Sequence, residues 1–271
     1  MNKKVSSIIF NLIVFIVSLI AIVPFIWSLY ASFNSTMVMN KEFFSPLNFT
    51  FKNFGYILTE FPYTRWFLNS VVVSVFVCLG NLIINTMAGY SLARLKFKGS
   101  GFILWMTLSL MMIPSQVLLA PTYVVLTKLG WISTFKGLII PFLFNLFNIF
   151  LVYQFLLDIP SDLEEAGEID GLNPIGIFLN IIIPLSVPIL ITQSILSFTN
   201  NWNSYLWPSL IGNVESYYTL PVGLNSFYGV YYQDGNSVQA GVMLLTLPII
   251  IFYIFVQRFL KTNDITSGIK A

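Results

Sequence analysis

The sequence predicts an all-α integral membrane protein with six transmembrane helices. Of its 271 residues, 56% are hydrophobic and only 9% are charged, against about 25% charged residues in a typical soluble domain. A soluble protein of this length needs charged side chains to cover its surface, so lipid is the solvent that fits this composition. Apolar runs long enough to cross a bilayer recur along the chain and support the same conclusion.

The first apolar run follows Met-Asn-Lys-Lys, a start that is also typical of signal peptides. It extends from about residue 8 to residue 31. This length exceeds the apolar core of a signal peptide, and no cleavage motif of small residues stands at its end. We therefore expect a retained first helix.

Six spans are expected, each of about 20 or more residues, which is enough to cross about 30 Å of hydrocarbon. They cover residues 8–31, 67–93, 102–126, 137–157, 182–211 and 238–257. Together they would form a single transmembrane domain over residues 1–271. Several spans contain proline, which transmembrane helices tolerate as kinks where neighbouring groups satisfy the freed backbone.

The distribution of positive charge predicts the orientation. Six spans place both chain ends on one side of the membrane, and that side holds eight of the 13 Lys and Arg residues, against five on the other. Because Lys and Arg accumulate in cytoplasmic loops, both termini are expected in the cytoplasm.

The spans lack Asp, Glu, Lys, Arg and His away from their ends. A proton-coupled transporter normally keeps an ionisable relay in the membrane, so this absence argues against proton coupling but leaves sodium coupling open. The chain has no His and one Cys, Cys78, which argues against a His/Cys metal site and a disulfide framework. A net charge of +2 is too small to suggest nucleic acid.

The loop at residues 158–181 is the one strongly charged segment, with six acidic residues and no basic residue. Ser161 followed by Glu164 predicts a capping box that begins a short helix. Gly171 predicts a left-handed residue that ends this helix, and Asn173-Pro174 predicts the start of a second one.

Two interpretations of this acidic helix remain open. A helix of about nine residues is marginal alone in water, and Glu164 and Glu168 repel each other at i,i+4 spacing. It is either part of a solvated acidic hairpin or a helix that docks on a basic surface through its face of Leu163, Ala166 and Gly167. A membrane enzyme is disfavoured, because the acidic cluster has no His, metal partner or base beside it.

The loop contains Glu165-Ala166-Gly167, then Gly171 after three residues, then Ile181-x-Ile183-Pro184 after nine more. This arrangement resembles the cytoplasmic motif of ATP-binding-cassette importer permeases, although Gly167 and Ile183 replace an alanine and a leucine. In that family the segment is the coupling helix, which sits in a cleft of the ATPase. The resemblance implies a set of ATPase-coupling residues, of which Glu165 would pair with a basic ATPase residue. The set is Glu164, Glu165, Ala166, Gly167, Asp170, Gly171 and Pro184.

Further motifs narrow the resemblance to carbohydrate importer permeases, over nearly the whole chain. They are Asn69-Ser70, Ala88-Gly89-Tyr90, Ala93-Arg94, Phe97-x-Gly99, Trp202-Asn203, Leu206-Trp207-Pro208, Leu220-Pro221-x-Gly223-Leu224, and a tail of Phe255-Val-Gln-Arg-Phe and Gly268-Ile-Lys270 that matches the six-span maltose-type subunit. The resemblance implies a type I importer fold that forms half of a sugar or oligosaccharide pathway by alternating access. Importer permeases for phosphate, polyamines or amino acids, and a sodium-coupled secondary transporter, remain alternatives.

The resemblance also implies partners. They would be a second permease subunit in a heterodimer, an ATPase dimer, an extracytoplasmic sugar-binding protein and the lipid of a bacterial inner or plasma membrane. The chain lacks a phosphate-binding loop. We therefore expect a non-catalytic subunit that binds no cofactor, with ATP and Mg used by the ATPase.

Two polar clusters have two interpretations each. Asn200, Asn201, Trp202, Asn203 and Tyr205 either line the translocation path or make interhelical hydrogen bonds. Tyr217, Tyr218, Tyr228, Tyr231 and Tyr232 either form an interfacial aromatic belt or contact the binding protein, for which Tyr is a common anchor. The basic loop at residues 94–99 is explained by topology or by contact with lipid headgroups.

Overall fold

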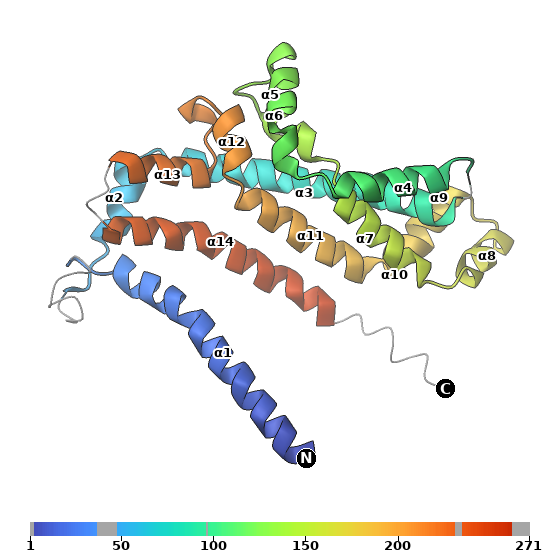
Figure 1. Cartoon of the computed structure of the whole chain (residues 1–271), viewed down its shortest axis with the longest axis horizontal. Coiled ribbons are helices and arrows are strands. Elements are labelled where there is room, and N and C mark those ends of the chain that lie inside the picture. Colours follow the sequence, from blue (N-terminus) through green and yellow to red (C-terminus); the bar gives the residue numbers. More distant parts are fainter. Residues whose placement is uncertain (1–2, 37–47, 96, 231–234, 262–271) are drawn as a thin grey trace. The chain divides into compact units, whose positions relative to one another are not determined.

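The computed structural model describes residues 3–36, 48–95, 97–230 and 235–261. Apart from an isolated antiparallel bridge between Asn34 and Phe49, the regular structure of these residues is helical. The α-helices are α1 (Lys3–Ser32), α2 (Lys52–Glu60), α3 (Tyr63–Arg94), α4 (Ser100–Met111), α5 (Leu119–Lys128), α6 (Phe135–Ile139), α7 (Leu146–Leu157), α8 (Asp162–Ile169), α9 (Pro174–Ile177), α10 (Ile183–Leu185), α11 (Val187–Trp202), α12 (Leu206–Ile211), α13 (Leu220–Val230) and α14 (Gly235–Lys261) (Figure 1). Short 3₁₀ turns are η2 (Ser115–Leu118), η3 (Ile140–Phe142) and η5 (Glu215–Tyr217), and η4 (Phe178–Ile182) is a π-helical turn.

Four helical segments in the described part of the chain are long and apolar enough to cross a membrane. They are Ile9–Ser32, Tyr63–Arg94, Phe135–Leu157 and Gly235–Phe259. Two further pairs qualify if each counts as one bent span: Ser100–Met111 with Ser115–Lys128, bent by 95°, and Pro174–Leu185 with Val187–Trp202, bent by 76°. The described residues therefore hold four to six candidate spans, as expected for an all-helical membrane protein.

The expected third and fifth spans, at 102–126 and 182–211, are not single helices. Proline lacks an N–H and collides with the carbonyl four residues earlier, so it is best tolerated in the first turn of a helix. Pro114 stands between α4 and η2, and Pro188 lies in the first turn of α11. Residues 206–211 form the separate helix α12, with Pro208 in its first turn.

The chain divides into two compact units. The first comprises Met1–Arg65 and Gly223–Pro248. Within it, the amide of Asn53 donates to the carbonyls of Ser32 and Asn34, both at 2.9 Å. The amide of Asn236 donates to the carbonyls of Asn34 and Thr36 at 2.9 and 2.8 Å. These bonds join the end of α1 to α2 and to the start of α14. The expectation that residues 1–271 form a single transmembrane domain stays a prediction.

The second unit, Trp66–Val222 and Ile249–Ala271, contains a buried amide network around Asn81 of α3. The Asn81 amide donates to the carbonyl of Phe142 at 2.7 Å, and its Oδ1 accepts from Asn85 at 2.7 Å and from Asn148 at 3.1 Å. The backbone carbonyl of Asn81 accepts from Gln193 of α11 at 2.8 Å. Polar side chains inside a membrane protein cannot form hydrogen bonds to water and must pair within the protein. This network therefore fixes α3 against α7 and α11, which lie beside it in Figure 1.

Replacing Asn81 with Ala should destabilise this unit by about 1–3 kcal/mol, because Asn85 and Asn148 would lose their shared acceptor in a buried place. The thermal unfolding midpoint of the purified chain in detergent measures this loss. Asn200→Ala, which removes an exposed amide, is the matched control. Equal midpoints for the two variants would contradict a stabilising role for the network.

Candidate functional site

The acidic loop forms two short helices, α8 and α9, and its predicted turns are confirmed. Gly171 has a φ of +84°. The N–H of Leu172 donates to the carbonyl of Gly167 at 2.9 Å, and the N–H of Gly171 donates to that of Glu168 at 3.0 Å, which together end α8 in a Schellman motif. The side chain of Asn173 accepts the N–H of Gly176 at 2.7 Å and begins α9, whose first residue is proline.

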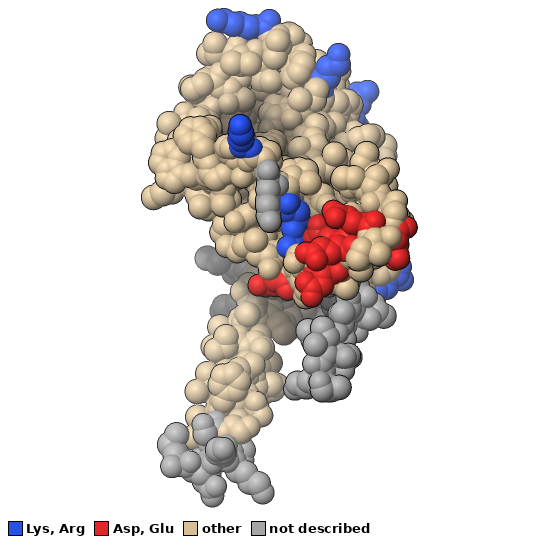
Figure 2. Space-filling model, turned by 90° about the vertical axis from the view of Figure 1, so that its right-hand side faces the viewer, with Lys and Arg blue, Asp and Glu red and all other residues tan. Residues whose placement is uncertain are grey.

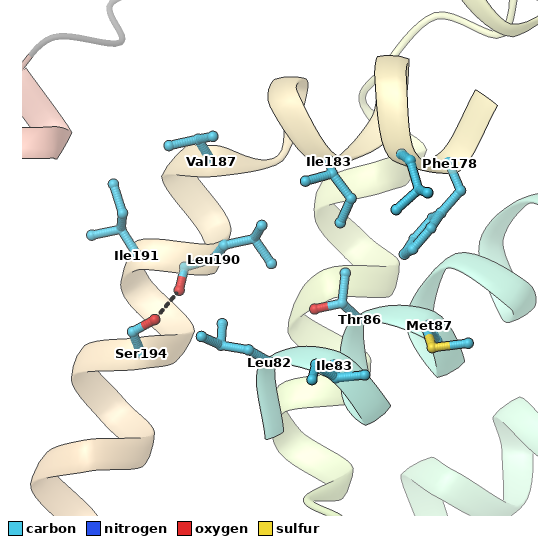
Figure 3. A pocket seen from close by; sticks show the side chains of 11 residues that line it. Leu82, Ile83, Thr86, Met87, Phe178, Ile183, Val187, Leu190, Ile191 and Ser194 are labelled. Atoms are coloured by element: carbon cyan, nitrogen blue, oxygen red, sulfur yellow. Dashed lines mark hydrogen bonds between the residues drawn. The ribbon is translucent and has the colours of Figure 1, made fainter. Parts of the chain in front are cut away.

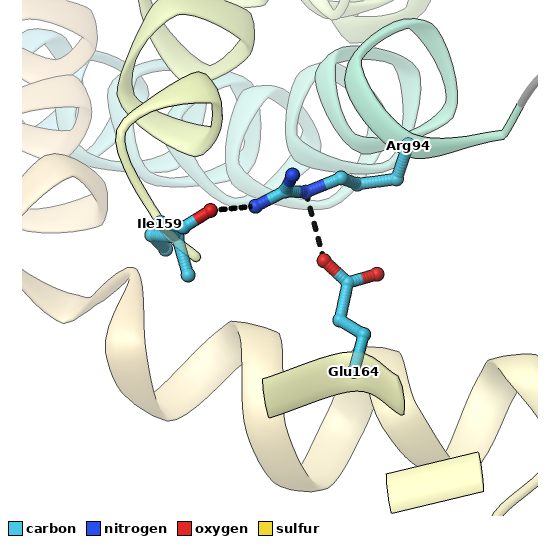
Figure 4. Close-up of polar contacts among 3 residues, drawn as sticks. All are labelled: Arg94, Ile159 and Glu164. Atoms are coloured by element: carbon cyan, nitrogen blue, oxygen red, sulfur yellow. Dashed lines mark hydrogen bonds and ion pairs between the residues drawn. The ribbon is translucent and has the colours of Figure 1, made fainter. Parts of the chain in front are cut away.

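The predicted capping box at the start of α8 is wrong. Ser161 has helical backbone angles and makes no side-chain capping bond. Its carbonyl still accepts the N–H groups of Glu164 and Glu165, at 2.9 and 3.1 Å. The box fails because the Glu164 side chain is directed to Arg94, at the end of α3, instead of back to Ser161 (Figure 4).

Arg94 ties α3 to this loop through two contacts. Its Nε lies 2.8 Å from Oε1 of Glu164, and its Nη2 donates to the carbonyl of Ile159, just before α8 (Figure 4). The Arg94 and Glu164 side chains are only 14% and 15% exposed. Tyr90 of α3 also interacts with the Glu164 carboxyl and lowers its pKa. The expectation that the basic loop at residues 94–99 serves topology or lipid contact therefore does not account for Arg94, because the Arg94 side chain contacts this chain itself.

The pKa of Glu164 is raised above its ordinary value because burial removes water from the carboxylate. The positive charge of Arg94 opposes this effect, the negative charge of Glu168 adds to it, and the interaction with Tyr90 opposes it. Arg94 therefore offsets part of the cost of burying this carboxylate.

The inner face of α8 is occupied by this chain. A Cβ built on Gly167 would lie 2.6 Å from Cδ1 of Ile181 and 3.5 Å from side-chain carbons of Ile177 and Leu172. Beneath it lies a buried cluster of Tyr90, Val152, Leu156, Ile177 and Ile182. The expectation that Gly167 leaves room for another protein is thus corrected, because Ile181 fills that space.

The outer face of α8 is acidic and exposed. Its exposed residues are Asp162, Leu163, Glu165, Ala166, Glu168, Ile169 and Asp170, and Ile169 is 86% exposed. Figure 2 shows Asp and Glu side chains gathered in one patch, with a basic side chain beside it. Such a face suits a basic partner surface that also offers an apolar contact. Pro184 is exposed as well, but on α10.

The predicted path residues at the end of α11 differ in their surroundings. Trp202 is 1% exposed, stacks on Phe198 with ring centroids 5.6 Å apart and meets Phe67 edge-on at 5.8 Å. Asn201 donates to the carbonyl of Ser197 at 2.8 Å, within its own helix. Asn200, Asn203 and Tyr205 are exposed, so these three are not enclosed by the rest of this chain.

The pair Asn69-Ser70 of the sequence motif holds the loop that precedes α13. The Asn69 amide donates to the carbonyls of Ser216 and Tyr218, both at 2.9 Å. The Ser70 hydroxyl accepts the N–H of Leu220 at 2.7 Å. These three bonds fix the backbone on both sides of the first two predicted tyrosines.

The predicted tyrosines are described only in part. Tyr217 packs edge-on against Phe135 of α6 with ring centroids 5.4 Å apart. Tyr217 and Tyr218 are both partly exposed. Tyr231, Tyr232 and the side chain of Tyr228 lie outside the described residues, and the proposed contact of these tyrosines with a binding protein stays a prediction.

A pocket of about 480 Å³ lies between α3 and the bend formed by α10 and α11 (Figure 3). Most of its lining is apolar, and its hydroxyl side chains are Thr86 and Ser194. Thr86 is directed to Gln193 at 3.4 Å, and Ser194 donates to the carbonyl of Leu190 at 2.7 Å. Because both hydroxyls are engaged within the protein, the pocket lacks the convergent polar groups that a sugar site needs.

Gly167→Leu should destabilise the protein by about 1–3 kcal/mol, because the new side chain overlaps Ile181. Gly167→Ala should be nearly neutral, since the end of the Ile181 side chain can rotate away from one methyl group. Thermal unfolding in detergent and limited proteolysis at residues 158–181 measure both effects. Ala166→Leu on the exposed face is the control, and Ile181→Ala should partly rescue Gly167→Leu. A stable Gly167→Leu protein would contradict this packing.

Comparison with known proteins places the chain in a family. Residues 85–263 match the family model described as "Binding-protein-dependent transport system inner membrane component". The chain is 34% identical to the arabinooligosaccharides transport system permease protein AraQ of Halalkalibacterium halodurans, over 94% of this chain and 93% of the relative. It is 30% identical to the trehalose transport system permease protein SugB of Mycobacterium tuberculosis, over 92% of each chain.

A solved structure has the same fold. The crystal structure of a bacterial ABC transporter involved in the import of the acidic polysaccharide alginate contains a chain that superimposes with a TM-score of 0.82 at 24% identity, covering 94% of this chain and 96% of that one. The likeness supports the all-helical fold expected for an importer transmembrane subunit. On the family match and the identity to its permeases, the chain belongs to the inner-membrane permease components of binding-protein-dependent transport systems.

Proposed function

We propose that this permease subunit serves an ATP-driven importer of oligosaccharides and that α8 is the helix on which the ATPase acts. Membership of a binding-protein-dependent family supports a binding protein and an ATPase as partners. The names of relatives support the substrate class: they are permeases for arabinooligosaccharides, trehalose and galactooligosaccharides. A sodium-coupled secondary transporter does not fit such a family.

The observation that carries the coupling role is the two-sided character of α8. Its inner side is packed on this chain at Gly167, whereas Glu165 and Ile169 are exposed on its outer side. In this proposal Glu165 pairs with a basic ATPase residue, and Ala166 and Asp170 border that contact. Gly171 ends the helix, so that the loop returns toward Pro184 and the membrane.

The proposed orientation places both termini and α8 in the cytoplasm of a bacterial cell. The excess of Lys and Arg on that side of the expected topology supports it. A second permease subunit would complete the pathway, with Asn200, Asn203 and Tyr205 as the exposed polar groups of this half. The loop around Tyr217 and Tyr218 would face the binding protein on the other side.

Purification of the tagged chain from its native membrane in mild detergent tests this proposal. We expect a second permease, an ATPase and a binding protein to co-purify. The melting temperature of the captured binding protein is then measured with arabinotriose, trehalose or galactotriose. Phosphate, putrescine and glutamine serve as controls. A saccharide should raise its melting temperature. Stabilisation by a control solute alone would overturn the substrate class, and a chain that purifies alone and transports would overturn the coupling role.

A further inference from the structure

Two adjacent glutamates of α8 face different surroundings. Glu165 is exposed on the acidic outer face. Glu164 is mostly buried, and the partners described above, Arg94 and Tyr90, both belong to α3. Adjacent residues of a helix are about 100° apart around its axis, so one of this pair can meet an external protein while the other meets its own chain.

Arg94 is placed to connect three segments at once. It is the last residue of α3. Its guanidinium contacts the Ile159 carbonyl, between α7 and α8, and the Glu164 carboxylate in the first turn of α8. A guanidinium can make both contacts because it presents several N–H donors in a fixed plane, whereas a lysine ammonium is a single point charge.

The helix that Arg94 terminates is the longest in its unit. Over its 32 residues, α3 carries Asn81, which bonds to α7 and α11, and Asn69, which holds the loop before α13. The helix that ends at Arg94 is therefore directly hydrogen-bonded to α7, to α11 and to the loop before α13, so a shift of α3 would bear on all three.

We propose that Arg94 is a positioning residue that transmits movement of α8 to α3, and that Glu164 serves this internal clamp instead of the ATPase contact. The inference rests on the proposed function, in which the ATPase moves α8. Arg94 gains a role that the acidic loop alone does not suggest. Of the two glutamates, Glu164 contacts this chain and Glu165 contacts the ATPase.

Hydrogen–deuterium exchange on the assembled complex in lipid nanodiscs tests this clamp. The complex contains both permeases and the ATPase, and exchange is compared without nucleotide and after trapping with ATP and vanadate. In the wild type, trapping should change the exchange of both α8 and the end of α3. In Arg94→Gln the change at α8 should persist, whereas most of the change at α3 should be lost, because the contact that joins the two segments is gone.

Matched variants separate transmission from folding. Lys98→Gln removes an exposed positive charge four positions after Arg94 in the sequence and should respond as the wild type does. The charge swap Arg94→Glu with Glu164→Arg keeps the ion pair but loses the contact with the Ile159 carbonyl. It should restore part of the response of α3, which a general loss of stability would not permit. If Arg94→Gln does not accumulate, the milder Glu164→Gln is measured in its place. In that variant, too, trapping should change the exchange of α8 but not that of α3.

The outcomes distinguish failure of the proposed coupling function from failure of the Arg94 clamp. No change at α8 in the wild type would overturn the proposed coupling function, and the clamp with it. A wild-type change at α8 without one at α3 would overturn the clamp alone. So would an Arg94→Gln or Glu164→Gln complex in which both segments respond as in the wild type, or a charge swap that restores nothing.

Discussion

Polar side chains inside a largely apolar, lipid-facing chain must find their partners within the protein, and the second unit is organised by two such sets of contacts. At the middle of α3, the amide and carbonyl of Asn81 hold α7 and α11. At the end of α3, Arg94 holds the loop that carries α8. In both places the alternative is a buried, unpaired polar group, which costs more than the net gain of an ordinary hydrogen bond. Helix α3 is consequently tied at its centre and at the end that lies beside α8.

The sequence predicted the features that depend on local chemistry. Gly171 and Asn173 turn the chain as expected, since a left-handed glycine and an asparagine cap need only their immediate neighbours. The all-helical membrane class followed from composition. The breaks at Pro114 and Pro188 were expected only as kinks, because the sequence does not show whether neighbouring helices will support a continuous helix through a proline.

The missed features depend on contacts between distant segments. The capping box at Ser161 was expected from local sequence, but the Glu164 side chain pairs with Arg94, which lies 70 positions earlier in the chain. The signal was present in part: Arg94 ends a span, and the acidic loop has no basic residue of its own. Trp202 shows the opposite case, because an aromatic among amides suggested a sugar path, whereas its ring is buried between Phe198 and Phe67.

Helix α8 has an inner side packed on this chain at Gly167 and, in the proposed complex, an outer side that meets the ATPase. Site-specific photo-crosslinking in the assembled complex tests this claim most directly. A benzoylphenylalanine placed at Glu165 or Ile169 should form adducts with the ATPase, and one placed at Glu164 should react within its own chain. Adducts to the ATPase from Glu164, or none from either outer position, would contradict the account.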